Sequence, residues 1–260
     1  MAGEVRLEKQ GKLGFVVFDH QERRNAISAK MWQDIPEIAK EVGEDDDVRV
    51  VILRGAGDVA FVAGADISEF EQTRRGDSAK DYDADNGRAF VALATIDKPV
   101  IAMIHGFCIG GGVAISLTAD MRYAADDVRM GIPAARLGLG YSMAGIETLA
   151  RLVGYSHAME IFFTAKRFRG EQALRMGLLN GLFPKAELET EVVKIAEMIA
   201  DNAPLTVRAA KLAVRELQRP HDQRRPERVD AAIQACYASE DYKEGVSAFL
   251  EKRRAQFRGR

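Results

Sequence analysis

Apolar residues in the first half of the chain gather in short runs separated by polar segments. Three of these runs are typical of buried strands: 14–19 (GFVVFD), 48–55 (VRVVILRG) and 99–106 (PVIAMIHG). A helix is predicted from Ala29 to about Val42, with Ser28 as its N-cap and Pro36 as a cause of a kink or a late start. Strands that alternate with helices in this way favour an α/β fold with parallel strand pairing.

The pattern changes to a helical one from about residue 187 onward. Helices are predicted over 187–201, 205–218, 226–239 and 241–254, and prolines separate them. The last helix is rich in both signs of charge, which is typical of a solvated face and less often of a binding surface.

Composition excludes several classes of protein. The 260 residues include 37 basic and 39 acidic side chains, so a formal charge of −2 argues against nucleic-acid binding. Cys108 and Cys236 are far apart and the four histidines are scattered, so neither a disulfide framework nor a metal site is expected. No apolar run approaches the ~20 residues of a membrane span, and no targeting signal is evident. We therefore expect a cytoplasmic protein without membrane contact.

Two small-residue turns stand out as candidate ligand sites. The first, AFVAGADISEF (60–70), follows a strand and precedes a helix expected to begin near Asp66; the second, HGFCIGGGV (105–113), precedes an apolar helix at 113–117. Such turns expose backbone N–H groups at a helix N-terminus, although most strand–helix turns bind nothing. Neither turn has the Gly-Lys-Ser/Thr of a phosphate-binding loop or the G-x-G-x-x-G of a dinucleotide fold, which disfavours nucleotide binding.

The two turns together, about 45 residues apart, resemble the crotonase (enoyl-CoA hydratase/isomerase) superfamily. Three further blocks are similar to the family in the same order: RRNAIS (23–28), MGIPAARLGLGYSMAGIETLARLVG (130–154) and SEDYKEGVSAFLEKRRAQF (239–257). The resemblance implies a crotonase-type spiral of β-β-α units over residues 1–200. It also implies a C-terminal helical region, 201–260, that covers the acyl-CoA site and joins subunits into a trimer or a dimer of trimers.

The resemblance assigns an acyl-CoA substrate, with coenzyme A as part of the thioester and no separate cofactor. Two backbone N–H groups, those of Ala65 and Gly111, would hold the thioester oxygen as enolate charge develops on it. The tight turn is expected to need the conformational freedom of Gly111. The positions that match CoA contacts are Arg24, Ala26, Ala63, Asp66, Ile67, Ser68, Phe249 and Lys252. Ser68 stands where hydratases often carry lysine, and the last two positions often reach CoA from a neighbouring subunit, or else are a packed aromatic and a solvated lysine.

The sequence departs from the hydratase pattern at both catalytic glutamates. Ala114 and Ala134 occupy those positions, and alanine can neither donate nor accept a proton. A positioned acid or base contributes about 10²–10⁴-fold, so hydration by the usual route should be very slow. The stretch 137–146 and the block 237–253 are similar to the methylmalonyl-CoA decarboxylase branch, although that branch keeps a glutamate at the Ala114 position. A decarboxylase-like lyase is therefore favoured, with Tyr141 as the candidate to orient a carboxylate or donate a proton.

Other roles stay open at this point. A hydratase or isomerase of fatty acid metabolism could use Tyr141 or His105 as a substitute acid or base. The missing carboxylates are equally what a non-catalytic acyl-CoA-binding protein would show. The acidic side chains near the turns, Glu69, Glu71 and Glu147, are expected on helix surfaces. A further catalytic position of the family holds Met143 here, and Asp120 is expected to hold structure.

Overall fold

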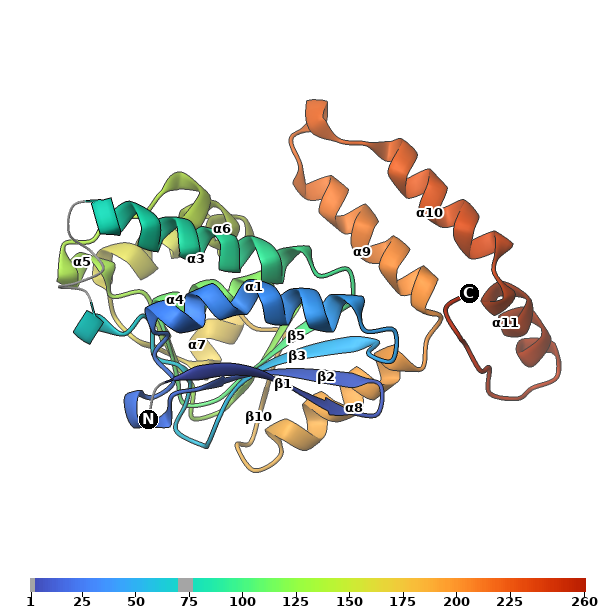
Figure 1. The fold of residues 1–260 in the computed structure, drawn as a ribbon, viewed down its shortest axis with the longest axis horizontal. Helices are drawn as coiled ribbons and strands as arrows, with labels where there is room; N and C mark the ends of the chain where they lie inside the picture. Colours follow the sequence, from blue (N-terminus) through green and yellow to red (C-terminus); the bar gives the residue numbers. More distant parts are fainter. Residues whose placement is uncertain (1–2, 70–76) are drawn as a thin grey trace.

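A six-stranded sheet forms the centre of the computed structural model, which describes residues 3–69 and 77–260 (Figure 1). Its order is β1-β2-β3-β5-β7-β10. The strands are β1 (Glu4–Gln10), β2 (Leu13–Asp19), β3 (Val50–Gly55), β5 (Val100–Ile104), β7 (Met121–Ala125) and β10 (Gly181–Phe183). Strands β1 and β2 form an antiparallel hairpin, and the remaining neighbours pair in parallel, as the alternating pattern predicts.

A smaller sheet of four short strands lies beside the first. It has the order β4-β6-β8-β9, with β4 (Ala60–Val62), β6 (Phe107–Ile109), β8 (Arg129–Gly131) and β9 (Phe168–Arg169). Each pass of the chain contributes one strand to each sheet and then a helix: β3-β4-α3, β5-β6-α4 and β7-β8-α5. This succession is the β-β-α spiral predicted from the resemblance.

Helices cover the sheets and form the C-terminal part of the chain. The helices are α1 (Ala29–Glu44), α3 (Asp77–Thr95), α4 (Gly111–Thr118), α5 (Ala134–Leu137), α6 (Met143–Thr164), α7 (Gly170–Arg175), α8 (Leu188–Ala200), α9 (Pro204–Gln218), α10 (Pro226–Ala238) and α11 (Glu240–Leu250). Short 3-10 turns are η1 (Gln21–Arg23), η2 (Ile67–Glu69) and η3 (His221–Gln223). None of the helices in the described residues is long and apolar enough to cross a bilayer.

The start of α1 confirms the predicted N-cap. The Ser28 hydroxyl accepts the Met31 backbone N–H at 3.3 Å, which satisfies one donor of the first turn. Pro36 lies inside the helix, which nevertheless runs from Ala29 to Glu44, so the expected late start is wrong. The last predicted helix is shorter than expected, because α11 ends at Leu250 and the chain then turns back toward the core.

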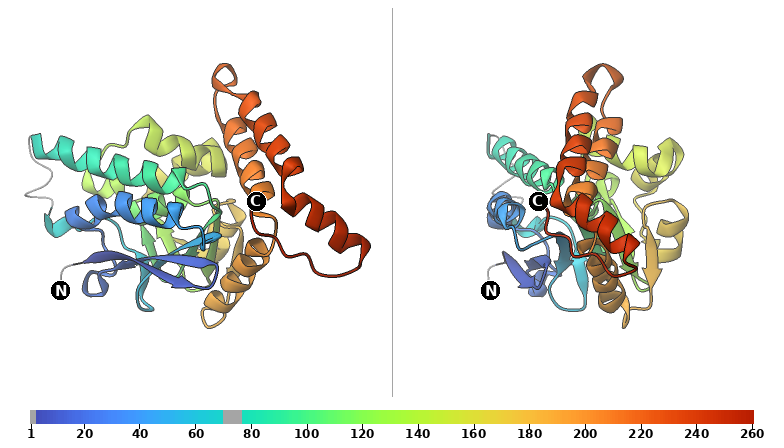
Figure 2. Two further views of the ribbon diagram at one scale, coloured as in Figure 1. Left: turned by 45° about the vertical axis from the view of Figure 1, so that its right-hand side comes forward. Right: turned by 90° about the vertical axis from the view of Figure 1, so that its right-hand side faces the viewer.

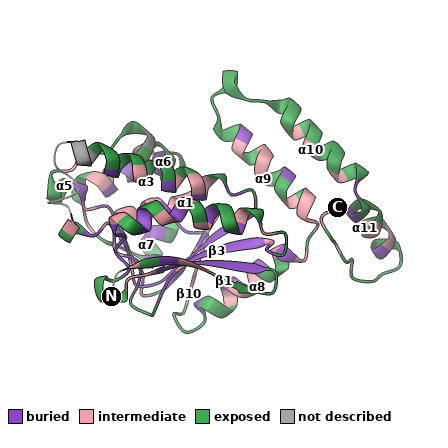
Figure 3. Ribbon diagram, in the orientation of Figure 1, coloured by how far each residue is buried: buried purple, intermediate pink, exposed green. Residues whose placement is uncertain are grey.

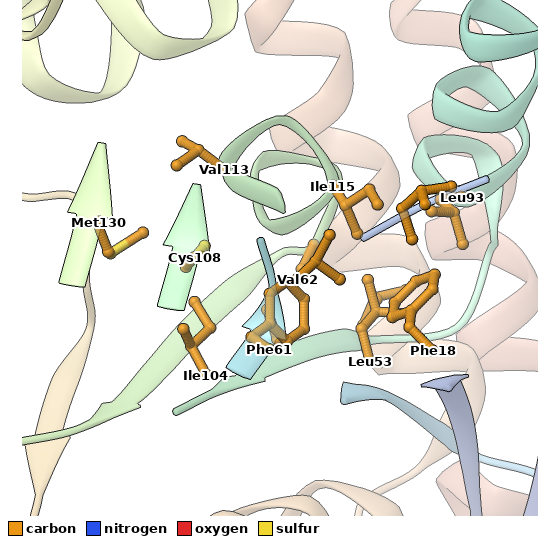
Figure 4. Close-up of a cluster of buried hydrophobic side chains, with 14 of the residues drawn as sticks. Phe18, Leu53, Phe61, Val62, Leu93, Ile104, Cys108, Val113, Ile115 and Met130 are labelled. Carbon is orange, nitrogen blue, oxygen red and sulfur yellow. The ribbon is translucent and has the colours of Figure 1, made fainter. Parts of the chain in front are cut away.

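The main core lies between the two sheets and under α1, α3, α4 and α6 (Figure 4). Val113 and Ile115 of α4 pack there with Phe61, Val62 and Cys108, so burial fixes the short helix against both β4 and β6. A second buried cluster forms on the other face of the large sheet, beneath α8. The central strands are accordingly buried along their length, whereas the C-terminal helices are largely exposed (Figure 3).

The helices α9, α10 and α11 extend away from the sheets (Figure 2). One connection to the core is an ion pair between Lys211 of α9 and Asp120, at 2.6 Å. Asp120 also accepts the Val100 N–H at the start of β5, at 2.7 Å, which agrees with its expected structural role. The division into 1–200 and 201–260 remains a prediction.

Candidate active site

Two of the predicted CoA-binding segments lie side by side. The Ala63 N–H donates to the Arg24 carbonyl at 3.1 Å, the Ile27 N–H donates to the Gly64 carbonyl at 2.8 Å, and the Asp66 N–H donates to the Ile27 carbonyl at 2.9 Å. These bonds join residues 24–27 to residues 63–66 along their backbones. The structure thereby brings Arg24, Ala26, Ala63 and Asp66 side by side, with Ala26 and Asp66 each 8% exposed.

A buried asparagine gives the first of these segments its shape. Asn25, 1% exposed, accepts the His20 N–H at 2.9 Å and donates to the carbonyls of Ala56 at 2.9 Å and Ala60 at 2.7 Å. Asn25 and Arg24 both have positive φ, of 57° and 54°. Sequence analysis did not single out Asn25, although asparagine is enriched among the non-glycine residues that adopt this conformation.

Ala65 and Gly111 are adjacent through space. A β-carbon placed on Gly111 would lie 3.6 Å from the Ala65 backbone nitrogen and 3.4 Å from the Trp32 ring. Trp32 is 1% exposed, and its indole N–H donates to the Tyr82 hydroxyl at 3.1 Å, so α1 and α3 together support the turn. Within residues 3–69 and 77–260, the N–H groups of Ala65 and Gly111 have no backbone or side-chain acceptor. Both donors are therefore available to a ligand oxygen.

The glycines whose backbone is left-handed in this turn are not Gly111, the glycine that was predicted to need it. Gly110 has φ 53° and Gly64 has φ 112°, whereas Gly111 is not in the left-handed region. The prediction that Gly111 needs conformational freedom is thus wrong. A methyl group there would meet only ordinary contacts, but it would occupy space beside the Ala65 N–H.

Asp66 organises the turn that follows Ala65. Its carboxylate accepts the Ser68 hydroxyl at 2.7 Å and the Ser68 N–H at 3.0 Å. Burial raises the pKa of the Asp66 carboxyl, but these hydrogen bonds outweigh it and hold the pKa below its usual value. In the described residues up to 69, the helix expected near Asp66 corresponds to the 3-10 turn η2, in which Ile67 is 57% exposed.

The side chains at the two hydratase positions are methyl groups on different helices. Ala114 lies in α4 and is partly buried, and Ala134 begins α5 and is 5% exposed. Tyr141 precedes α6 and is 37% exposed, with its ring edge-on to Phe162 at 5.1 Å between centroids. Tyr141 therefore has an aromatic support and remains accessible.

His105 lies among charged groups outside these loops. It is 8% exposed, and its Nε2 has no partner within the described residues. Burial lowers the pKa of the His105 imidazole, and the positive charge of Lys185 lowers it further, against an opposing effect of Asp127. The ring is consequently neutral at pH 7, and its charged neighbours are not members of the predicted site.

Phe249 and Lys252 are not brought to the site within one chain. Phe249, 83% exposed, lies on α11 at the opposite end of the molecule from η2 and the start of α3 (Figures 1 and 2). Lys252 follows α11 with φ 57° and is also exposed. Within one chain these two residues therefore lie away from the predicted site, and a role in a neighbouring copy stays a prediction.

The acidic side chains near the turns have structural contacts. Glu69 accepts the Ala29 N–H at the start of α1, at 2.7 Å, and Glu147 pairs with Arg151 at 2.6 Å. Glu71 lies outside the described residues. Met143 is 86% exposed at the start of α6.

The fold is a spiral of β-β-α units, and at the start of α4 two backbone N–H groups lack an acceptor among the described residues. The sequence model of the enoyl-CoA hydratase/isomerase family matches residues 8–260. The chain belongs to this family.

Named relatives within the family differ in activity. The chain is 36% identical to a crotonyl-CoA hydratase of Syntrophomonas wolfei, over 96% of each chain. It is 31% identical to the methylmalonyl-CoA decarboxylase of Escherichia coli, over 95% of each. A crystal structure of an enoyl-CoA hydratase/carnithine racemase from Magnetospirillum magneticum superposes with a TM-score of 0.91 at 30% identity, covering 98% of this chain and 96% of the other.

Proposed function

We propose that the chain binds an acyl-CoA thioester and stabilises its enolate with the N–H groups of Ala65 and Gly111. The supporting observation is that these two donors lie on adjacent segments and have no protein acceptor within the described residues. Fixed backbone donors need no reorganisation when charge develops on the thioester oxygen. Removal of one such donor from an oxyanion hole typically reduces turnover by about 10²–10³-fold.

The CoA moiety would lie along the surface formed by residues 24–27 and 63–68. Arg24 supplies a guanidinium there, whereas Ser68 is committed to Asp66 and offers no positive charge. Phe249 and Lys252 would complete this surface from a neighbouring subunit, in a homotrimer or a dimer of trimers. The exposure of both residues in the single chain supports this arrangement.

The reaction proposed is a decarboxylase-like lyase reaction, because Ala114 and Ala134 offer no acid or base. Cleavage of the bond to a β-carboxylate releases CO₂ and leaves the electron pair in the thioester enolate. This step requires no base, so it depends chiefly on the two N–H donors. The enolate carbon then takes a proton from water or from the Tyr141 phenol.

A hydratase is the second candidate, and the 36% identity to a crotonyl-CoA hydratase favours it. It requires a substitute acid or base, for which Tyr141 is better placed than His105, because His105 is buried among Lys185 and Asp127. A non-catalytic acyl-CoA-binding protein is the third candidate, supported by the two alanines.

Mass spectrometry of the protein incubated with crotonyl-CoA and methylmalonyl-CoA together separates the three candidates. Loss of CO₂ from methylmalonyl-CoA, with crotonyl-CoA unchanged, is the expected result. Addition of water to crotonyl-CoA at an enzyme-like rate would instead establish the hydratase. Binding of both thioesters without turnover would favour the binding protein.

The variant Gly111→Ala tests the oxyanion hole itself. The added methyl group meets only ordinary contacts at 3.4–3.6 Å, so the thermal midpoint should be little changed. Turnover should fall by about 10²-fold or more, because the methyl group lies beside the Ala65 N–H. Unchanged turnover in this variant would contradict the assignment of these donors.

A further inference from the structure

A cavity of about 280 Å³ lies where the chain's last residues meet the core. It is bounded by the start of β3, the turn before β5, the α8–α9 junction and the C-terminal tail. Its lining residues include four arginines: Arg49, Arg208, Arg258 and Arg260. Apolar side chains, among them Val48, Pro99 and Ile199, form the remaining wall, and Asp46 is the acidic residue of the lining.

The arginines have acidic neighbours beyond ion-pair distance, because Glu244 interacts with Arg258, Glu240 with Arg260 and Asp201 with Arg49. In the part of the chain that the structure describes, the guanidinium groups of Arg208, Arg258 and Arg260 form no ion pair or side-chain hydrogen bond. The Arg49 guanidinium donates to the backbone carbonyls of Ala200 at 2.9 Å and Phe257 at 2.6 Å, which fix its position without cancelling its charge. Four arginines thus line one cavity, in which Asp46 is the acidic side chain.

Hydrogen bonds with Asp241 and Arg49 help to hold the tail that carries Arg258 and Arg260. The carboxylate of Asp241, 3% exposed, accepts the Arg258 N–H at 2.6 Å and the Gly259 N–H at 2.7 Å. The bond between Arg49 and Phe257 anchors the tail on the opposite side. The backbone of this part of the cavity wall is therefore held in place by the buried Asp241 carboxylate and by the Arg49 guanidinium.

The cavity is separate from the candidate active site. Strands β3 and β5 run in parallel, start at the cavity and end toward the turns that carry Ala65 and Gly111 (Figure 1). The six residues of β3 alone span roughly 20 Å at ~3.3 Å per residue. An acyl-CoA thioester held at Ala65 and Gly111 of the same chain would place its reacting end at the other end of the sheet.

We propose that this cavity is a second binding site, for a phosphoanhydride group. Guanidinium groups bind phosphate oxygens in bidentate, charge-assisted pairs, and several of them are needed to balance a multiply charged anion. The N-terminus of α9 also lies in the wall at Pro204, and its first turn has no side-chain cap, so its N–H groups add to the positive field. The apolar wall would accommodate the organic part of a nucleotide.

Calorimetric titration of the full-length protein with inorganic pyrophosphate tests this proposal. Titrations are carried out without and with saturating CoA, and are repeated with ADP. The double variant Arg208→Gln/Arg258→Gln should weaken pyrophosphate binding by about a hundredfold, roughly tenfold for each guanidinium. The control is Arg175→Gln, because Arg175 is exposed on α7, outside the cavity lining.

The expected outcome is pyrophosphate binding that persists in saturating CoA and in Arg175→Gln, and that is lost in the double variant. Tighter binding of ADP than of pyrophosphate would show that the site recognises a nucleotide. Equal binding of the two would show that it recognises the phosphoanhydride group and nothing else of the nucleotide. Absence of binding, equal binding to the double variant, or full displacement by CoA would overturn the proposal. Acyl-CoA turnover by the double variant should equal that of the wild type, so failure here is distinguishable from failure of the proposed function.

Discussion

Gly112 of α4 packs so closely on β4 that a β-carbon added to it would overlap the carbonyl oxygen of Val62. The carbonyl carbon and the β-carbon of Val62 would each lie only 3.0 Å away. Val62 leads directly to the turn that carries Ala65, and Gly112 follows Gly111. This one contact therefore sets the spacing between the two proposed N–H donors.

Gly112→Ala should disturb both stability and function. Because the obstruction is backbone, which cannot rotate away, α4 or β4 must shift, at about 1–3 kcal/mol of unfolding free energy. The shift should also separate the donors and reduce acyl-CoA turnover by at least about tenfold. Urea denaturation and turnover of the same preparation would measure both effects.

Gly87→Ala is the matched control for this prediction. Gly87 is exposed in α3, and a β-carbon there would meet nothing within 4 Å. Alanine should raise the unfolding free energy by roughly 0.5–1 kcal/mol, because it restricts the unfolded chain. If Gly112→Ala behaved like Gly87→Ala, the close packing of α4 on β4 would not be required.

The long strands and the helix starts could be predicted from local pattern. The apolar runs 48–55 and 99–106 are confirmed as β3 and β5, and the Ser28 cap is confirmed at the start of α1. These features depend on hydrophobic periodicity and on capping chemistry within a few residues, both of which a single sequence displays.

The second sheet could not be predicted in this way. Strands β4 and β6 have three residues each, too few to show a period, and 46 residues of sequence separate the paired Ala60 and Phe107. The contact between Trp32 and Gly111 could not be predicted either, because it exists only once α1 packs across the turn. Long-range contacts of this kind are set by the fold rather than by local sequence.

Tyr141→Phe should reduce the proposed decarboxylation without loss of structure. The phenylalanine ring keeps the edge-on contact with Phe162, so the thermal midpoint should change little. A lost proton donor should lower kcat by about 10²-fold, with a smaller effect on KM, because the phenol acts after CO₂ departs or as it departs. Steady-state kinetics with methylmalonyl-CoA would measure this split.

Tyr155→Phe provides the comparison. Tyr155 is 80% exposed on α6, the helix that begins just after Tyr141, and loss of its hydroxyl should leave kcat unchanged. Equal kcat values for wild type, Tyr141→Phe and Tyr155→Phe would remove Tyr141 from the mechanism and leave water as the proton source.

Lys211 should make stability depend on alkaline pH. Burial lowers the pKa of its ammonium from 10.5 to about 8, although Asp120 opposes the shift. Between these two values the unfolded state holds the proton and the native state does not, so unfolding free energy should rise with pH. The rise from pH 8 to pH 10.5 should approach about 3 kcal/mol.

Comparison with Lys211→Met isolates this effect from other titrations. The difference in unfolding free energy, wild type minus variant, should increase across the window from pH 8 to 10.5 and be flat below it. Asp120 keeps its bond to the Val100 N–H in the variant, so the start of β5 should remain in place. A difference that falls with rising pH would mean that the ion pair, rather than the burial of Lys211, dominates.

Phe249→Ala should weaken CoA binding even though Phe249 is distant from the site of its own chain. If α11 of one copy covers the site of another, loss of the aromatic ring should raise the dissociation constant for CoA by about tenfold, or about 1.4 kcal/mol. Leu250→Ala is the control, because Leu250 is 74% exposed in the neighbouring position. Light scattering on the same samples reports whether both variants keep the oligomeric state. A monomeric wild type with CoA affinity equal to that of Phe249→Ala would show that each chain binds CoA without help from α11, and the surface of residues 24–27 and 63–68 would then have to suffice.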